Sequence, residues 1–461
     1  MHDERSAAVV GGGLAGLAAA WRLARAGVRV RVFEAGPRAG GVIGSVRGGG
    51  FLAELGANSL AEPSPAVRAL FREAGLEPRL LPTNAEARRR YVVRGGRPLA
   101  VPTSPPGLLA TRLLSLRAKL RVLAEPLAGP SREADESVSE MVRRRLGREV
   151  LDYLVEPFVA GIYAGDPDRL SARSAFPRLV GLEDEHGSLL RGAKAASRAR
   201  RAAGGSRDPS IYSFAEGMEE LPRALAAGLG GAVSVATAVR AVRQMPGGWA
   251  VETDASEETF GAVVLAVPAH ALGAMEIEGM DAADAEALAA IPHAPVAVLV
   301  QGFRREDVAH PLDGFGMLIP RVERRRIMGV LFTSTMFPGR APEGHVSLTT
   351  FVGGTRAPEM AALPPNRLAS VVGGELRALL GVRGDPVFSH HHHWTRAIPQ
   401  YVLGHGQAQR RMDAVERACP GVFLAGSYRS GVSVGDTLAS GLKSADAALA
   451  HLRVPAAAVP A

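Results

Sequence analysis

The first 34 residues carry the feature that most constrains the fold of this chain. Ala7–Val10 is a short apolar run, typical of a buried strand, and it leads directly into the glycine-rich segment Gly11–Gly16. A helix of small residues follows, and then a second strand, Val28–Phe33, which Glu34 closes. This order predicts a βαβ unit that binds a dinucleotide, with the Glu34 carboxylate accepting a hydrogen bond from a ribose.

Each position of the glycine segment has a physical role in such a unit. Gly11 permits a turn that a side chain would block, Gly13 lets the backbone approach a pyrophosphate, and Gly16 lets the helix pack closely on its strand. The N–H groups at the start of the helix, from Leu14 and Ala15 onward, point at the phosphates. The segment by itself leaves open whether the nucleotide is NAD or FAD.

Three further segments favour FAD. Arg38–Gly44 contains a second glycine pair, Phe51–Ser59 follows it, and Gly421–Asp436 lies near the other end of the chain. Together with the first glycines they resemble the FAD-binding parts of the flavin amine-oxidase superfamily. The resemblance implies one noncovalent FAD site built from the first 60 and last 40 or so residues. It further implies these cofactor contacts: Arg38, Gly40, Gly41, Gly56, Ala57, Asn58, Val239, Trp394, Gly426, Val432, Val434, Gly435 and Asp436.

Composition sets the class of protein. The 461 residues are 47% hydrophobic, which is typical of a folded chain of two or three domains. Cys419 is the single cysteine, so an intramolecular disulfide and a cysteine-rich metal site are excluded and an intracellular, cytoplasmic protein is expected. No apolar run reaches the roughly 18 residues of a membrane span.

Basic residues outnumber acidic ones, 54 to 46, and only three of the basic residues are lysines. The arginines are spread along the chain without interleaved aromatic residues, which argues against a nucleic-acid partner. Three arginine runs, 88–90, 143–145 and 324–326, are either solvated faces or contacts to acidic lipid or to a carboxylated substrate.

The pattern of apolar residues predicts an α/β protein (α+β overall). An amphipathic helix is expected from Ser64 to Gly75, mostly helical structure from Leu108 to about Arg201, a loop from Arg198 to Pro209, and a mostly antiparallel sheet from Pro292 to Val387. A Rossmann-like FAD domain then carries an inserted mixed-sheet substrate domain and a helical lobe. We assign 1–81, 213–270 and 396–461 to the FAD-binding domain, 82–90, 186–212 and 271–395 to the substrate-binding domain, and 91–185 to the lobe.

Motifs in the middle of the chain narrow the superfamily. They are Glu156–Asp168 with Leu170-Ser171, Asp313–Gly316, Gly329–Phe332, Phe351–Gly354, and Ile398–Tyr401 with Gly404-His405. Their combination resembles the oxygen-dependent, FAD-containing porphyrinogen oxidases over nearly the whole chain. The resemblance implies six-electron oxidation of protoporphyrinogen IX in haem biosynthesis, with O2 as acceptor and H2O2 as product; coproporphyrinogen III is the alternative substrate.

The same resemblance implies the residues that bind the substrate. Arg90 matches the arginine that reads a propionate, and a guanidinium can donate two hydrogen bonds to a carboxylate. Leu331 and Phe351 match the positions that sandwich a pyrrole ring, with Leu318 beside them, and Gly161 of the Glu156–Asp168 motif is a further expected contact. Read without the motifs, these apolar residues would be assigned to the core, and Arg90 to the surface.

No protein base is assigned. Asp166 and His405 lie in motifs but fit turn or supporting positions equally well, and the pyrrole N–H proton can be lost to solvent. Four consecutive histidines, His390–His393, would alternate between the faces of a strand and supply at most two ligands a side. We therefore expect no metal.

Two other classes stay open. An amine oxidase or carotenoid desaturase is disfavoured because no lysine stands between Lys194 and Lys443, and many amine oxidases hold one near the flavin. A binding protein of the Rab escort type that has lost FAD is disfavoured by Glu34 and Asp436. As partners we expect the porphyrinogen, O2, a membrane surface at the helical lobe, and a chelatase that takes the product.

Overall fold

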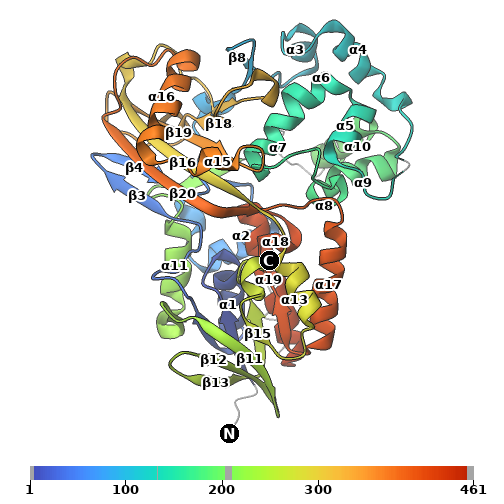
Figure 1. Ribbon diagram of the computed structural model, residues 1–461, viewed down its shortest axis with the longest axis vertical. Coiled ribbons are helices and arrows are strands. Elements are labelled where there is room, and N and C mark those ends of the chain that lie inside the picture. Colours follow the sequence, from blue (N-terminus) through green and yellow to red (C-terminus); the bar gives the residue numbers. More distant parts are fainter. Residues whose placement is uncertain (1–4, 132, 203–209, 454–461) are drawn as a thin grey trace.

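The computed structural model describes residues 5–131, 133–202 and 210–453. Its lower half in Figure 1 is built on a parallel sheet of strand order β10-β2-β1-β14-β21. These strands span Val233–Ser234, Arg29–Phe33, Ser6–Val10, Ala262–Leu265 and Val422–Leu424. β1 and β14 are buried along their whole length, as central strands covered on both faces should be.

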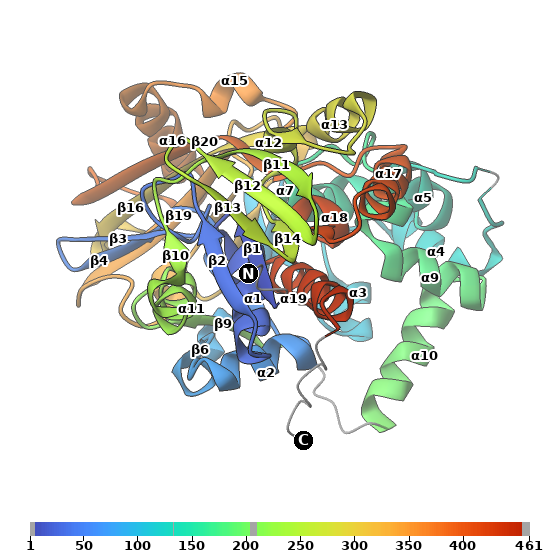
Figure 2. The same cartoon turned by 90° about the horizontal axis from the view of Figure 1, so that it is seen from below.

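Two layers cover this sheet. On one face, α1 (Leu14–Arg25) and α19 (Val434–His451) pack side by side (Figure 2). The other face packs against a four-stranded sheet, β13-β12-β11-β15, and α17 (His405–Ala418). These four strands span Glu257–Phe260, Gly248–Thr253, Val239–Met245 and Glu276–Ile277. The predicted Rossmann-like unit is confirmed.

A seven-stranded sheet forms the upper left part in Figure 1, in the order β20-β16-β19-β18-β17-β7-β8. Its strands span Phe388–Pro399, His293–Arg304, His345–Gly353, Gly329–Leu331, Gly316–Leu318, Arg90–Arg94 and Arg97–Ala100. All neighbours are antiparallel except β17 and β7. One face packs on α16 (Pro365–Leu380), a helix that the sequence analysis did not predict.

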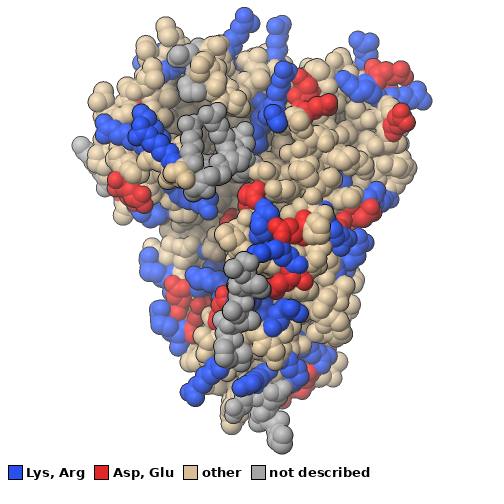
Figure 3. Space-filling model, turned by 180° about the vertical axis from the view of Figure 1, so that it is seen from behind, with Lys and Arg blue, Asp and Glu red and all other residues tan. Residues whose placement is uncertain are grey.

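The lobe at the upper right in Figure 1 is helical. It includes α3 (Pro105–Ala110), α4 (Leu116–Leu123), α5 (Val138–Arg145), α6 (Arg148–Val150), α7 (Glu156–Tyr163), α8 (Ala172–Ala175), α9 (Pro177–His186) and α10 (Leu189–Ala202). Among the helices that the structure describes, none has the length and apolar character needed to cross a bilayer. Basic and acidic side chains are interspersed on the face shown in Figure 3.

Three sequence expectations need correction here. Residues 91–100, placed in the lobe, form the hairpin β7–β8 at the edge of the large sheet. α10, placed in the substrate-binding domain, packs against α9 of the lobe. The loop expected from Arg198 is wrong as far as Ala202, because α10 continues to that residue; residues 203–209 lie outside the described ones.

Shorter elements complete the described chain. They are β3 (Ser45–Gly48), β4 (Phe51–Glu54), β5 (Leu60–Ala61), α2 (Pro65–Glu73), β6 (Leu80–Pro82), β9 (Ile211–Phe214), α11 (Glu220–Gly228), α12 (Ala269–Leu272), α13 (Ala282–Ala289), α14 (Thr333–Met336), α15 (Pro358–Ala361) and α18 (Ser427–Ser430). The helix expected from Ser64 is confirmed as α2, with Ser64 as its N-cap.

Candidate active site

The turn between β1 and α1 needs glycine at two positions for packing reasons. A methyl group on Gly11, whose φ is +105°, would lie 2.7 Å from the carbonyl oxygen of Ala266. A methyl group on Gly16 would lie 1.9 Å from the carbonyl oxygen of Gly11. Both glycines therefore permit the close approach of strand, turn and helix that the sequence predicts.

Gly13 differs from these two glycines, because the protein leaves space for a side chain at this position. Its φ of −73° suits any residue, and no atom lies within 4 Å of the place where a Cβ would be. It is the N-cap of α1, and no side chain caps the N–H groups of that helix. Open space in front of free N–H groups at a helix N-terminus suits a pyrophosphate.

Glu34 closes the turn from the end of β2. Its Oε2 accepts the N–H of Gly12 at 2.7 Å, and its Oε1 accepts the N–H of Gly36 at 2.6 Å. The carboxylate thus organises the loop around the expected ribose, with lone pairs left over. Thr237 donates its N–H to the carbonyl of Glu34, which brings the start of β11, and so Val239, close to this end of the site.

The second glycine pair folds onto the first segment. A Cβ on Gly41 would lie 3.3 Å from Cα of Gly13. Arg38 donates to the carbonyl of Ile43 at 2.7 Å and to that of Gly41 at 3.2 Å, so its guanidinium holds the loop that contains Gly40 and Gly41. The two loops together form one wall of a cradle, which is open in front of Gly13.

The loop after β4 adds an unpaired acceptor. Asn58 is buried and donates Nδ2–H to the carbonyl of Gly56 at 3.1 Å, while its Oδ1 has no hydrogen-bond partner. A methyl group on Gly56 would lie 2.5 Å from the carbonyl oxygen of Val42. A buried acceptor left without a partner next to Ala57 fits a ligand group that donates to it, as a bound flavin nucleotide would.

The C-terminal segment closes the cradle from the other side. Ser433 caps α19 by accepting the N–H of Asp436 at 3.1 Å, and its hydroxyl donates to Oδ2 of Asp436 at 2.6 Å. This places Asp436 and Gly435 in the first turn of a helix. Gly426, with φ of +146°, links β21 to α18, and its N–H donates to Ser440.

Three of the expected cofactor contacts have another packing role. Ala15 faces α19, where a methyl group on Gly441 would lie 2.0 Å from its carbonyl oxygen. Val434 is buried among apolar residues beside α1, and Val432 packs against the apolar cluster of the lobe. These positions shape the cradle through the backbone, and contact by their side chains stays a prediction.

Four of the five expected substrate residues lie on one face of the seven-stranded sheet. Arg90 pairs with Gly316, which pairs with Leu331. In the next row, Leu318 pairs with Gly329, which pairs with Phe351. Directly paired residues share a face of a sheet, so these four side chains project to the same side. The other face packs on α16.

The lobe and β20 border this face. Gly161 of α7 lies against it, since a methyl group there would be 3.0 Å from Cδ2 of Leu318. Val298 pairs with Phe351 on one side and with His392 on the other, so His392 shares the face. Trp394 follows two residues later and donates Nε1–H to the carbonyl of Leu55 at 2.6 Å. That bond ties the substrate face to the Gly56 loop of the cradle.

Sequence reasoning missed two residues near the site. His392 lies 4.2 Å from Trp394 between ring centroids, and burial, followed by nearby histidine and arginine charges, lowers the pKa of its imidazole. Tyr401 donates to the carbonyl of Ser427 at 2.5 Å and accepts the N–H of Gly431 at 2.6 Å, which fixes the turn before α19. The alternation of side chains along a strand could have predicted that His392 shares a face with Trp394. Nothing local in the sequence indicates that Tyr401 bonds to residues 427 and 431.

The two motif residues considered as a base both have side-chain contacts within the fold. Asp166 forms an ion pair with Arg356 at 3.0 Å and accepts the N–H of Asp168 at 3.0 Å. His405 is stacked on Tyr401, and burial lowers its pKa to about 4. Both side chains therefore support the fold around the site.

Glu54, at the end of β4, is a buried acid next to the cradle. It accepts hydrogen bonds from Ser45 Oγ at 2.6 Å and from the N–H of Met218 at 2.9 Å, and Arg340 lies 3.5 Å away. Burial raises its pKa to about 7, because desolvation outweighs these favourable contacts. The folded protein thus favours the protonated form.

We expect Glu54→Gln to flatten the dependence of stability on pH. With a pKa of about 7 folded and 4.5 as the reference value, the contribution of Glu54 is fully present below pH 4.5 and is lost as the pH rises through 7. The loss amounts to about 3 kcal/mol, since each pKa unit corresponds to about 1.4 kcal/mol. Urea unfolding at pH 5 and pH 8 measures it. Glu86→Gln, at an exposed site, is the control, and equal pH slopes in all three proteins would contradict the assignment.

Comparison with known proteins agrees with this site. The family model for flavin-containing amine oxidoreductases matches residues 14–449. Protoporphyrinogen oxidase 2 of Arabidopsis thaliana is 36% identical over 96% of this chain and 94% of its own length. Coproporphyrinogen III oxidase of Staphylococcus aureus is 29% identical over 97% of this chain and 100% of its own length.

Solved structures share the whole architecture. A crystal structure of a candidate protoporphyrinogen oxidase from Exiguobacterium sp. 255-15 superposes with a TM-score of 0.81, at 25% identity, over 98% of this chain and 100% of that one. A putrescine oxidase bound to putrescine shares the fold, with a TM-score of 0.68 at 19% identity over 97% of this chain and 99% of that one. The glycine cradle, the seven-stranded sheet and these matches agree, and the chain belongs to the flavin-containing amine oxidoreductases, in their porphyrinogen oxidase branch, with FAD as its cofactor.

Proposed function

We propose that this protein oxidises a porphyrinogen to the porphyrin in three two-electron steps, with O2 as the final acceptor and H2O2 as the product. The observation that carries the proposal is the single sheet face that presents Arg90, Leu331, Phe351 and Leu318 and is joined through Trp394 to the glycine cradle. The names of the relatives, which include both protoporphyrinogen and coproporphyrinogen III oxidases, support the substrate class.

FAD supplies the redox chemistry, by accepting a hydride from a bridging carbon of the substrate. The residues of this chain hold and orient the cofactor and the substrate. The N-terminus of α1, with Gly13 in front, would hold the pyrophosphate, and Glu34 would accept a hydrogen bond from the ribose. Asp436, held by Ser433, would contact the ribityl-pyrophosphate portion, and Asn58 Oδ1 would accept a hydrogen bond from the nucleotide.

The residues expected to bind the substrate provide one charged contact to a propionate and a set of apolar contacts to a pyrrole ring. Arg90 is exposed, with its guanidinium 5.3 Å from the ring centroid of Phe315, so it can turn toward a propionate without breaking an ion pair. Leu331 and Phe351 are partly buried and hold a pyrrole ring between them. We assign no protein base, and the pyrrole proton leaves to solvent.

The choice of substrate depends on which protein residues meet the edges of the porphyrinogen ring that Arg90, Leu331 and Phe351 do not contact. We expect turnover of protoporphyrinogen IX, with coproporphyrinogen III as an equal or better substrate if the far edges meet further arginines. Comparing kcat/KM for both compounds in one preparation, with peroxide measured alongside, gives the ratio. Turnover of neither compound, together with oxidation of an amine, would contradict the proposed function.

Peripheral membrane contact of the lobe is part of the proposal. Leu116, Leu120, Leu123 and Leu127 follow helical spacing along and just beyond α4 and are 72%, 58%, 61% and 86% exposed. Apolar side chains so exposed, beside Arg117 and Lys119, fit an acidic lipid surface.

We expect the protein to co-sediment with vesicles containing anionic lipid, and Leu120→Glu with Leu123→Glu to reduce the bound fraction severalfold. Val235→Glu, at an exposed apolar residue far from α4, is the control. Equal sedimentation of all three proteins would exclude this surface.

The product, a metal-free porphyrin, is what a chelatase consumes, so a chelatase is the class of enzyme expected to receive it.

A further inference from the structure

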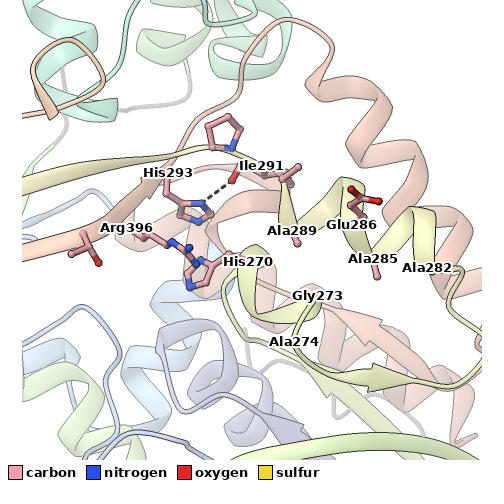
Figure 4. Close-up of a pocket in the computed structure, with 13 residues that line it drawn as sticks. His270, Gly273, Ala274, Ala282, Ala285, Glu286, Ala289, Ile291, His293 and Arg396 are labelled. Carbon is pink, nitrogen blue, oxygen red and sulfur yellow. Dashed lines mark hydrogen bonds between the residues drawn. The ribbon is translucent and has the colours of Figure 1, made fainter.

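An open cavity of about 810 Å³ shares no lining residue with the cradle or with the substrate face. It is bounded by α12, α13, the start of β16 and the residues Thr395-Arg396 of β20 (Figure 4). Much of its wall consists of small residues, among them Gly273, Ala274, Ala282, Ala285 and Ala289. Its volume is in the range of small-molecule sites, and it lies between two helices on one side and two strands of the seven-stranded sheet on the other.

Basic side chains gather at one end of this cavity. Figure 4 shows the guanidinium of Arg396 beside the ring of His270, with His293 next to them. The two imidazole rings lie 5.1 Å apart between centroids, at an interplanar angle of 85°. Glu286, the acidic residue of the lining, lies on α13, away from this group.

The polar groups at this end lack protein partners. Arg396 is exposed, and within the described part of the chain its guanidinium forms no ion pair and no hydrogen bond. Nδ1 of His270 is buried without a partner. Nδ1 of His293 bonds to the carbonyl of Ile291 at 2.9 Å, which leaves its Nε2 available.

A break in strand pairing places Arg396 here. Val296 pairs with Trp394 and Ala294 with Ile398, so a single β16 residue, Pro295, faces the three residues Thr395–Ala397 of β20. Such bulges redirect side chains out of the regular alternation. The bulge follows directly after Trp394, so Arg396 points away from the flavin side and into the cavity.

We propose that this cavity binds a small organic anion, whose carboxylate or phosphate group lies between Arg396 and His270 and whose apolar part lies along the alanine wall. A guanidinium forms its strongest hydrogen bonds with such oxyanions, and the unpaired imidazole nitrogens supply further donors when protonated. The cationic end alone would suit inorganic phosphate; the apolar extension favours an organic body. This inference concerns binding and does not rest on the proposed oxidation.

Calorimetric titration of the flavin-loaded protein tests it, with octanoate, octyl phosphate and neutral octanol as probes. We expect one site for each anion and at least tenfold weaker binding of octanol. A preference between octanoate and octyl phosphate shows whether the site favours a carboxylate or a phosphate group. Octanol binding as tightly as both anions would overturn the proposal.

Variants locate the site. Arg396→Gln is expected to weaken octanoate binding about tenfold or more, whereas Arg367→Gln, at an exposed arginine of α16, should not change it. Arg90→Ala should also leave octanoate binding unchanged, which separates this cavity from the substrate face. Ala289→Phe, which keeps the basic end but fills the cavity, should abolish binding of the octyl probes. Unchanged binding in Arg396→Gln and Ala289→Phe would contradict the assignment.

The pH dependence adds a readout that packing alone would not give. The groups that face the bound anion are Arg396, His270 and His293, with Glu286 on α13. Burial and the Arg396 charge lower the pKa of both imidazoles, and a bound anion would raise it again. Octanoate should therefore bind several times more tightly at pH 6 than at pH 8, and His270→Asn should reduce this difference. Equal affinity at the two pH values in the parent protein would exclude the imidazoles as donors.

Discussion

Replacing Gly13 by valine should give a folded protein without flavin. The backbone at Gly13 suits any residue and no protein atom lies within 4 Å of the added Cβ, so the chain itself tolerates the side chain. The side chain would occupy the space assigned to the pyrophosphate and block the N-terminus of α1. We expect loss of about 3 kcal/mol or more of FAD binding, a hundredfold or greater rise in Kd.

Absorbance of the purified protein near 450 nm, and FAD released on acid denaturation, give the result. The parent should be yellow and release intact FAD, and the variant should be colourless with an unchanged circular dichroism spectrum. Gly374→Val, at an exposed glycine of α16 that also has open space around it, is the matched control and should stay yellow. A yellow Gly13→Val protein would place the pyrophosphate elsewhere.

Arg90→Ala should raise KM for the porphyrinogen about ten- to a hundredfold. A charge-assisted hydrogen bond to a propionate is worth about 1.5 to 3 kcal/mol, and each 1.4 kcal/mol is a factor of ten. The contact exists in the ground state and in the transition state alike, so kcat should fall much less than KM rises. Steady-state kinetics of peroxide formation separate the two constants.

Arg89 is the natural control, because it is the next residue and equally basic. Its side chain is 64% exposed and pairs with Asp313, whose other oxygen accepts from Tyr91 at 2.6 Å. Arg89→Ala should leave KM within about twofold, since the residue precedes β7 and its charge is already paired. Equal effects of the two variants would mean that net charge, rather than a specific contact, attracts the substrate.

The flavin cradle could be predicted from sequence because its determinants are local. One βαβ unit contains Gly11, Gly13, Gly16 and Glu34. Their spacing along the chain therefore predicts where they lie relative to one another. Gly16 illustrates this best, since the reason given from the pattern, close packing of helix on strand, is the contact that the structure contains.

The substrate face could not be derived in this way. Arg90, Leu318, Leu331 and Phe351 share it only because β7 pairs in parallel with β17, more than 200 residues later in the chain. Spacing along the sequence carries no information on such pairing, and only the resemblance to a family supplied it. The boundary errors have the same origin, because the strands Arg90–Arg94 and Arg97–Ala100 belong to the large sheet through partners distant in sequence.

The contact between Ala15 and Gly441 bears on when the protein acquires its cofactor during synthesis. α1 is made first, yet a face of it is covered by α19, and Asp436 on α19 is expected to form a wall of the cradle that α1 begins. A nascent chain that has not yet released residue 441 from the ribosome lacks both the cover and that wall. We therefore expect flavin uptake only after α19 has been translated and has folded back onto α1.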